Sequence, residues 1–266
     1  MSDLYNQSQD EALSPVSDAP VDVLKPPRRV PTSRAARWIY QGFTVFDCGM
    51  GMSVGIALIA MGLQLINCVL IYESLVLNLL LSLFSLVFAA GYMAVADGGY
   101  RQRQICFGNY FAGFRKNMGQ LLLAQAIYMG LIFAVVFIGS FLMEKICGAW
   151  LMIQINGINE LNFDLILLCY LIILMFVLPL MLLVVYAPAL IYFHDLKAWT
   201  AMKLSFEACL KNMLPLLWLW ILLSLLLLLG FLMLVVGLLM VLPVLGYANY
   251  FSYRDIFLYE DEVISV

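Results

Sequence analysis

The only histidine of the chain stands beside an aspartate, and this pair is the first place to look for acid–base chemistry. His194 and Asp195 follow a long apolar run and precede Lys197. A histidine beside a carboxylate can move protons, but catalysis also needs a nucleophile, a metal or a second acid–base group within reach. The sequence offers no such group near the pair, so we expect no enzymatic activity and no catalytic residue.

The cysteines are the other residues that could carry chemistry. They show no CxxC spacing, and most fall in or beside apolar runs, which is typical of cysteines that pack as small apolar side chains. With a single histidine, a site built from several histidines is excluded. We therefore expect neither a metal nor a cofactor. The six cysteines are Cys48, Cys68, Cys106, Cys147, Cys169 and Cys209.

The composition places the chain in a membrane. Apolar residues make up 64% of the 266 positions and charged residues 12%, whereas a soluble domain has roughly 45–50% and about 25%. Several apolar runs exceed the roughly 18 residues that distinguish a membrane span from a buried helix. The formal net charge of −3 suggests no nucleic-acid partner. We expect an all-α, multi-pass membrane protein whose first partner is the lipid bilayer.

Six membrane spans are predicted from the apolar runs and the charges between them. Residues 212–253 contain no charge, and a single helix of that length would measure roughly 60 Å, about twice the hydrocarbon thickness. This run must therefore form two spans, and Gly230 and Gly237 are the expected sites of the reversal. The six predicted spans are 49–71, 75–96, 118–142, 165–192, 213–230 and 233–252.

The segments outside the spans set the orientation. With six spans and the amino terminus inside, thirteen of the fourteen Lys and Arg lie on the inner side, and Lys145 lies outside. This asymmetry follows the positive-inside rule and predicts that both termini are cytoplasmic. Residues 1–33 are rich in proline, serine and charge, so we expect a disordered tail there. Residues 34–258 form the membrane domain, and residues 259–266 form a short acidic tail.

Two stretches, 110–125 and 203–220, resemble each other and predict a parallel internal repeat. Six identities, from Phe111 to Leu122 in the first copy, recur at a constant offset of 95 residues. In each copy a cationic segment enters an apolar run, as expected of a helix in the cytoplasmic interface followed by a span. Asn117 and Asn212 stand at equivalent junctions. Four cations are candidates for lipid-headgroup contact: Arg115, Lys116, Lys203 and Lys211.

The segment from Ala198 is predicted to form an amphipathic helix with three faces. Lys203, Glu207 and Lys211 fall at successive i, i+4 positions and form a charged ladder. A second face is apolar: Trp199, Met202, Phe206, Cys209 and Met213. The third is a stripe of small or polar residues, and we expect it to pack on the protein itself, against the earlier copy. Its members are Ala198, Ala201, Ser205, Ala208 and Asn212.

Few polar groups enter the predicted spans. No Asp, Glu, Lys, Arg or His lies within them, and ion-coupled transport normally requires such groups at membrane depth. Gln64 and Asn67 lie three residues apart on one face of the first span. They are expected either to form hydrogen bonds between helices or to line a small cavity.

Four stretches carry a resemblance to a family of proteins. They resemble an uncharacterised family of bacterial inner-membrane proteins that is distantly similar to the membrane domain attached to some glycerophosphoryl diester phosphodiesterases. The resemblance covers roughly residues 35–258 and implies a bacterial, multi-pass protein without an assigned reaction. No phosphodiesterase domain accompanies it, so that substrate is not carried over. The stretches are LFSLVFAAGYMAVADGG, FGNYFAGFRKNMGQLLL, YAPALIYFHDLKAWTAMKLSFEACLKNMLPLL and LPVLGYANYFSYRDIF.

Two functions follow as hypotheses. The first is an inner-membrane protein without catalytic activity, with a structural, lipid-related or accessory role and a membrane-protein partner or a second copy. The alternative is a transporter or channel for a neutral or lipid-like molecule, because prolines interrupt two of the spans. A dry bundle would favour the first, and a water-filled cavity lined by Gln64 and Asn67 would favour the second. An intramembrane enzyme ranks third.

Overall fold

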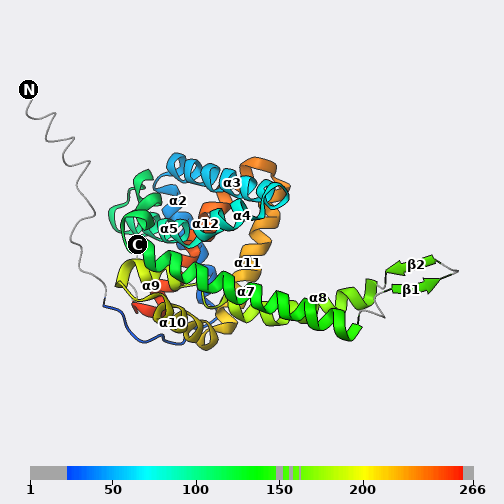
Figure 1. The fold of residues 1–266 in the computed structure, drawn as a ribbon. Coiled ribbons are helices and arrows are strands. Elements are labelled where there is room, and N and C mark those ends of the chain that lie inside the picture. The colour runs from blue at the N-terminus through cyan, green and yellow to red at the C-terminus, as the bar shows by residue number, and fades with distance from the viewer. Residues whose placement is uncertain (1–22, 148–151, 156–157, 162, 260–266) are drawn as a thin grey trace, which may run out of the picture.

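The computed structural model describes residues 23–147, 152–155, 158–161 and 163–259, and helices dominate this part of the chain (Figure 1). The long helices follow the apolar runs, and shorter ones connect them at the end of the bundle that carries most of the charge. The helices are α2 (Arg34–Asp47), α3 (Met50–Glu73), α4 (Leu75–Leu83), α5 (Ser85–Gln102), the 3-10 helix η1 (Phe107–Phe111), α6 (Ala112–Arg115), α7 (Met118–Cys147), α8 (Phe163–Met181), α9 (Ala187–His194), α10 (Ala198–Lys211), α11 (Met213–Leu232) and α12 (Leu234–Phe257).

Four helical stretches among the described residues are long and apolar enough to cross a membrane. They are Met50–Glu73, Leu75–Gln102, Met118–Lys145 and Met213–Leu232. The class of helical membrane protein is therefore supported, and four of the six predicted spans have a counterpart. The second span consists of α4 and α5, which meet at Phe84, and it extends beyond the predicted end at residue 96.

The predicted fourth span, 165–192, is interrupted, as its prolines indicated, and consists of two helices. The helix α8 contains Pro179 and ends at Met181, and α9 begins at Ala187. Between them, the amides of Leu182 and Leu183 donate to carbonyls three residues back rather than four. A proline removes one helical hydrogen bond and clashes with the preceding turn, which accounts for the end of α8. Pro188 is tolerated because it lies in the first turn of α9.

The reversal between the last two helices lies at Met233, between the two glycines proposed for it. Gly230 and Gly237 face each other across the turn, and a Cβ on Gly237 would lie 2.3 Å from the carbonyl oxygen of Gly230. The glycines therefore allow α11 and α12 to approach closely, and neither of them forms the turn itself. The predicted boundaries at 230 and 233 are close to those of the structure.

The helix α12 is the central element of the fold and not a peripheral span. It packs against α2, α3, α5 and α11 (Figure 1). Its second half brings three tyrosines into the core at intervals of three residues, Tyr247, Tyr250 and Tyr253, all fully buried. Gly42 of α2 gives α12 room, since a Cβ there would lie 3.2 Å from backbone atoms of Val244 and Ala248.

The ends of the membrane domain differ from the prediction. Residues 23–33, assigned to the disordered tail, form an extended segment, and the amides of Lys25 and Arg28 donate to the carbonyls of Phe257 and Ile256. We call residues 23–33 the N-terminal strap. Tyr259, assigned to the acidic tail, donates its hydroxyl hydrogen bond to the Pro26 carbonyl. The strap is ordered because α12 offers it backbone partners; residues 1–22 and 260–266 lie outside the described residues.

A hairpin of α7 and α8 extends away from the bundle, with two short strands at its far end (Figure 1). The strands β1 (Met152–Ile155) and β2 (Ile158–Leu161) pair antiparallel, with Met152 opposite Leu161. The all-α prediction did not include them. Gly139 lets α8 approach α7, since a Cβ there would lie 2.9 Å from the Ile173 side chain.

Candidate functional site

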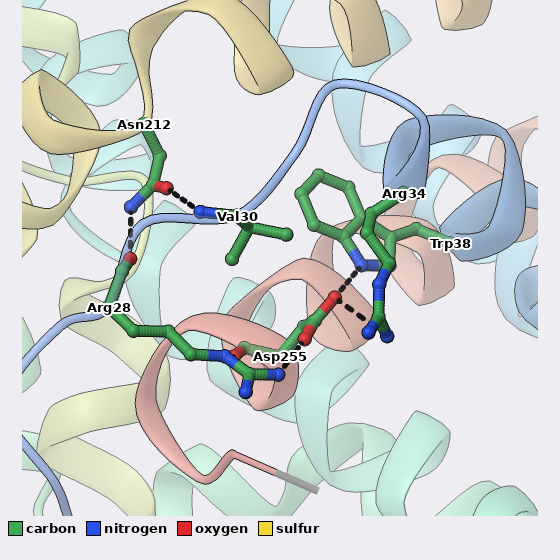
Figure 2. A network of polar contacts seen from close by, with 6 residues as sticks. All are labelled: Arg28, Val30, Arg34, Trp38, Asn212 and Asp255. Atoms are coloured by element: carbon green, nitrogen blue, oxygen red, sulfur yellow. Dashed lines mark hydrogen bonds and ion pairs between the residues drawn. The ribbon is translucent and has the colours of Figure 1, made fainter. Parts of the chain in front are cut away.

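The densest group of polar contacts surrounds the carboxyl end of α12, and Asp255 is the first of its centres (Figure 2). The Asp255 carboxylate is almost fully buried and forms an ion pair with Arg28 of the strap. Arg34 lies 3.7 Å from the same carboxylate, and Nε1 of Trp38 donates to it at 2.9 Å. A buried carboxylate is costly unless it is paired and hydrogen-bonded. The strap and α2 supply those partners.

Asn212, at the junction of α10 and α11, holds the other side of the strap (Figure 2). Its Oδ1 accepts from the amide of Val30 at 2.8 Å, and its Nδ2 donates to the carbonyl of Arg28 at 2.8 Å. A carboxamide has both a donor and an acceptor, so it can bond a backbone amide and a backbone carbonyl of an extended segment, as a neighbouring β-strand would. The strap is thus fixed to α12 on one side and to the α10–α11 junction on the other.

A second cluster centres on Asp97 of α5. Its Oδ1 accepts from Nε of Arg101 at 2.8 Å and from the hydroxyl of Tyr250, and Arg254 lies 3.4 Å away. The Arg254 guanidinium lies 4.3 Å from the centre of the Tyr100 ring, a cation–π distance, and its side chain is only 4% exposed. The neighbours Arg254 and Asp255 therefore belong to two different clusters, one on each side of α12.

The side chains of His194 and Asp195 each contact a residue of another element. Nε2 of His194 lies 2.5 Å from the hydroxyl of Tyr253 on α12. Asp195 accepts from Nδ2 of Asn117 and lies 3.3 Å from Nζ of Lys116. The Asn117 hydrogen bond, followed by the Lys116 charge, lowers the pKa of Asp195. These contacts join the loop after α9 to the start of α7.

The two asparagines of the predicted repeat occupy similar junctions. Asn117 has a positive φ of 58° immediately before α7, and its Nδ2 donates to the Ile191 carbonyl at 2.9 Å. Asn212 likewise precedes α11 and donates to a distant carbonyl. However, the cationic segment before Asn117 is the short η1 and α6, whereas α10 is one continuous helix. The internal repeat therefore stays a prediction.

The helix α10 begins at Ala198, as predicted, and buries the predicted small stripe. Ala201 and Ser205 are fully buried. Ser205 accepts from the Tyr186 amide at 3.0 Å and donates to the Leu182 carbonyl at 2.8 Å. The stripe therefore packs mainly on the segment between α8 and α9. It touches the earlier copy at its start, where Gln120 accepts from the amide of Ala198.

The other faces of α10 differ partly from the prediction. Lys211 pairs with Glu207 at 2.7 Å, but Lys203 lies over the Trp199 ring at 5.3 Å, so only half of the charged ladder forms. Trp199 is 51% exposed. Two members of the apolar face, Met202 and Cys209, are buried. The exposed part of the helix is narrower than expected, and it carries a tryptophan beside a lysine.

The remaining predicted site residues lie on α3 and at the start of α7. Asn67 accepts hydrogen bonds from Nδ2 of Asn78 on α4, at 2.6 Å to its side chain and 2.9 Å to its carbonyl. Gln64 is exposed and does not take part in this contact, so the structure does not bring Gln64 and Asn67 together. Arg115 and Lys116 are exposed as well, and Lys116 lies 5.7 Å from the centre of the Tyr192 ring.

The sequence alone does not indicate the clusters around α12, because their partners are distant in sequence. Arg28 and Asp255, for example, are separated by 227 positions. One local signal could have indicated the clusters: Asp97, and likewise the neighbouring residues Arg254 and Asp255, are charged residues next to apolar runs. In the described part of the chain no three residues form a candidate metal site, and every buried side-chain N or O atom has a partner. The arrangement can fasten helices together.

Comparison with known proteins adds no function to this geometry. No protein-family model, curated protein or solved structure matches the chain. The resemblance to the bacterial inner-membrane family is thus left as a prediction, and any function must be argued from the residues.

Proposed function

We propose that this is an integral protein of the bacterial inner membrane with a lipid-related, non-catalytic role, in which cations at the charged end of the bundle hold anionic phospholipid headgroups. The observation that carries the proposal is the exposed edge of α10, where Lys203 lies over the ring of Trp199 while the opposite stripe is buried. Tryptophan and lysine in this arrangement are typical of the membrane–water interface.

A second pair of cations supports the same assignment. Arg115 and Lys116 are exposed directly before α7, one of the four candidate spans, so they lie where a helix enters the bilayer. Tyr192 accompanies Lys116 there, as aromatic residues do at headgroup level. Clusters of Lys and Arg beside a span attract anionic lipids, at about 1 kcal/mol per cation near the surface. Lys116 and Lys211 contribute less than Arg115, because each already lies beside a carboxylate, Asp195 and Glu207 respectively.

The orientation follows from the same charges. Thirteen of the fourteen Lys and Arg lie on the strap, on α2 or on the elements gathered around the end of α12, and Lys145 lies near the far end of α7 (Figure 1). In the proposed orientation the charged end and both termini face the cytoplasm, in accord with the positive-inside rule.

Mass spectrometry of the intact protein released from native membranes tests the proposal. We expect retained anionic phospholipid, either phosphatidylglycerol or cardiolipin, in preference to phosphatidylethanolamine. The triple variant Arg115→Gln, Lys116→Gln and Lys203→Gln should retain several-fold less anionic lipid, whereas Lys145→Gln, at the far end, should retain as much as the original protein. Equal retention by the triple variant, or no preference for anionic lipid, would refute the role in headgroup binding.

Transport of a neutral or lipid-like molecule, the alternative, gains no specific support from the broken helix. Free carbonyls at such a break could bind a substrate, but two carbonyls of the segment between α8 and α9 already have partners. The Leu182 carbonyl accepts from Ser205 at 2.8 Å, and the Val185 carbonyl accepts from Nδ2 of Asn249 at 3.4 Å. The segment is thus built as a contact between helices.

A further inference from the structure

Gln64 is an exposed carboxamide within a candidate span. Gln64 is exposed in α3, and no hydrogen-bond partner for it exists among the residues that the structure describes. It lies about 21 Å along the helix from Met50 and about 14 Å from Glu73, which corresponds to the middle of a bilayer. Lipid chains cannot bond a carboxamide, and an unsatisfied amide in hydrocarbon is costly. Asn67, one turn away, does not share this situation, because Asn78 bonds it.

Gln64 belongs to a face of α3 that begins as a packing surface. Residues spaced three or four apart lie on one side of a helix, and this side carries Ser53, Ala57, Ala60, Gln64 and Cys68. Ser53 and Ala57 are buried, with Ser53 bonded to the Tyr247 hydroxyl of α12 at 3.0 Å. Ala60 is half-buried, and Gln64 and Cys68 are exposed. The same face that packs on α12 therefore continues outward without a cover.

The residues on this face suit a second helix. Ala60 and Cys68 lie one turn before and one turn after Gln64, and small residues at such positions let two helices approach within the reach of a side-chain amide. A carboxamide is also self-complementary, because its NH₂ can donate to the oxygen of an identical group.

We propose that α3 pairs with α3 of a second copy of this chain, in parallel about a two-fold axis normal to the membrane, with the two Gln64 carboxamides bonded to each other. All copies insert with the same orientation. In a two-fold symmetric contact, each residue close to the axis therefore lies next to the same residue of the other copy. Two hydrogen bonds between the amides satisfy the only polar groups of the uncovered part of this face.

Cys68 allows the proposal to be tested by disulfide cross-linking through a native cysteine. Its thiol is free and exposed, one turn from Gln64 on the same face. At a close parallel contact the two Cys68 residues can come within the 4.4–6.8 Å between Cα atoms that a disulfide requires. Mild oxidation of native membranes with copper phenanthroline should give a covalent dimer of twice the chain mass in a variant that retains Cys68 as its only cysteine.

Three variants separate specific pairing from chance collision. Gln64→Leu should reduce the disulfide yield by about tenfold, the effect of two modest hydrogen bonds between helices, and it should not unfold a lipid-facing helix. Gln64→Asn should restore part of the yield. A thiol moved to the adjacent face by Cys68→Ser with Val69→Cys should cross-link poorly. Equal yields from Gln64→Leu or from the moved thiol, no dimer at all, or a disulfide to another protein would overturn the proposal.

Discussion

The charged end of the bundle and the outer half of α3 are built in opposite ways. At the charged end the strap, α2, α5 and α12 surround two carboxylates, the buried Asp255 and the partly buried Asp97, with guanidinium partners. In the outer half of α3 the side chains are mostly apolar and exposed, and Asn67–Asn78 is a rare internal contact. In the first region, charged groups are paired with each other and packed against aromatic rings within the chain. In the second region, the exposed apolar side chains must be covered by the bilayer or by another chain.

The largest effect is expected where charge is most deeply buried. Asp255→Ala removes the carboxylate that pairs with Arg28 and accepts from the indole N–H of Trp38. Breaking a buried ion pair on one side typically costs about 3–5 kcal/mol. The free energy of unfolding in mixed micelles should fall by that amount. Glu207→Ala is the matched control, since it breaks an exposed pair on α10 and should cost at most about 0.5 kcal/mol; equal losses would mean that burial does not distinguish them.

Glycines provide the next contrast between the two regions. A Cβ on Gly91 of α5 would lie 1.8 Å from the carbonyl oxygen of Tyr110, a backbone atom that cannot rotate away, whereas a Cβ on Gly62 of α3 would meet nothing within 4 Å. Gly91→Ala should therefore cost about 1–3 kcal/mol of unfolding free energy, and Gly62→Ala should change it by about 0.5 kcal/mol or less. Thermal unfolding of both variants in the same detergent measures the difference. Equal melting temperatures would contradict the tight contact of α5 with η1.

A more local effect is expected for the strap alone. Asn212→Ala removes the acceptor for the Val30 amide, and an unsatisfied buried amide costs about 1–3 kcal/mol. Because the loss is local, the strap should detach before the bundle unfolds, and trypsin should cleave faster after Arg28 or Arg29. Asn117→Ala, at the equivalent junction, is the control and should leave cleavage of the strap unchanged. Identical rates for Asn212→Ala and the original protein would contradict the fastening of the strap.

The smallest effect is the pH dependence contributed by Asp195. Its pKa lies below the ordinary value of 3.8 in the folded protein, so the unfolded chain binds the proton more readily. The stabilisation is present above pH 3.8 and is lost as the pH falls through the lowered pKa. The stability difference between the original protein and Asp195→Asn should therefore shrink toward zero between about pH 5 and pH 2. Because the side chain is exposed, the difference is small even at neutral pH; a difference that grows at low pH would reverse the assigned sign.

Local pattern was sufficient for some elements and insufficient for others, for physical reasons. The apolar runs predicted α3, α7 and α11 because a bilayer imposes length and apolarity on each span independently. The stripe with Ala201 and Ser205 was recognisable from its spacing alone. The pairing of Arg28 with Asp255 was not, because nothing in a local window indicates a partner 227 positions away. The central place of α12 could not be predicted for the same reason, because the sequence of an apolar helix is similar whether lipid or protein surrounds it.

The place of α12 has a consequence for the order in which the protein is made. The helix α12 follows α2, α3, α5 and α11 in the chain, yet all four pack against it, and Arg28 pairs with Asp255, which lies 227 positions later. The earlier helices therefore enter the membrane before their common partner exists, and the charged end can close only after α12 has been made. A nascent chain stopped just short of residue 255 should consequently remain a set of inserted helices whose charged end is not closed, and a chaperone or protease would meet it in that form.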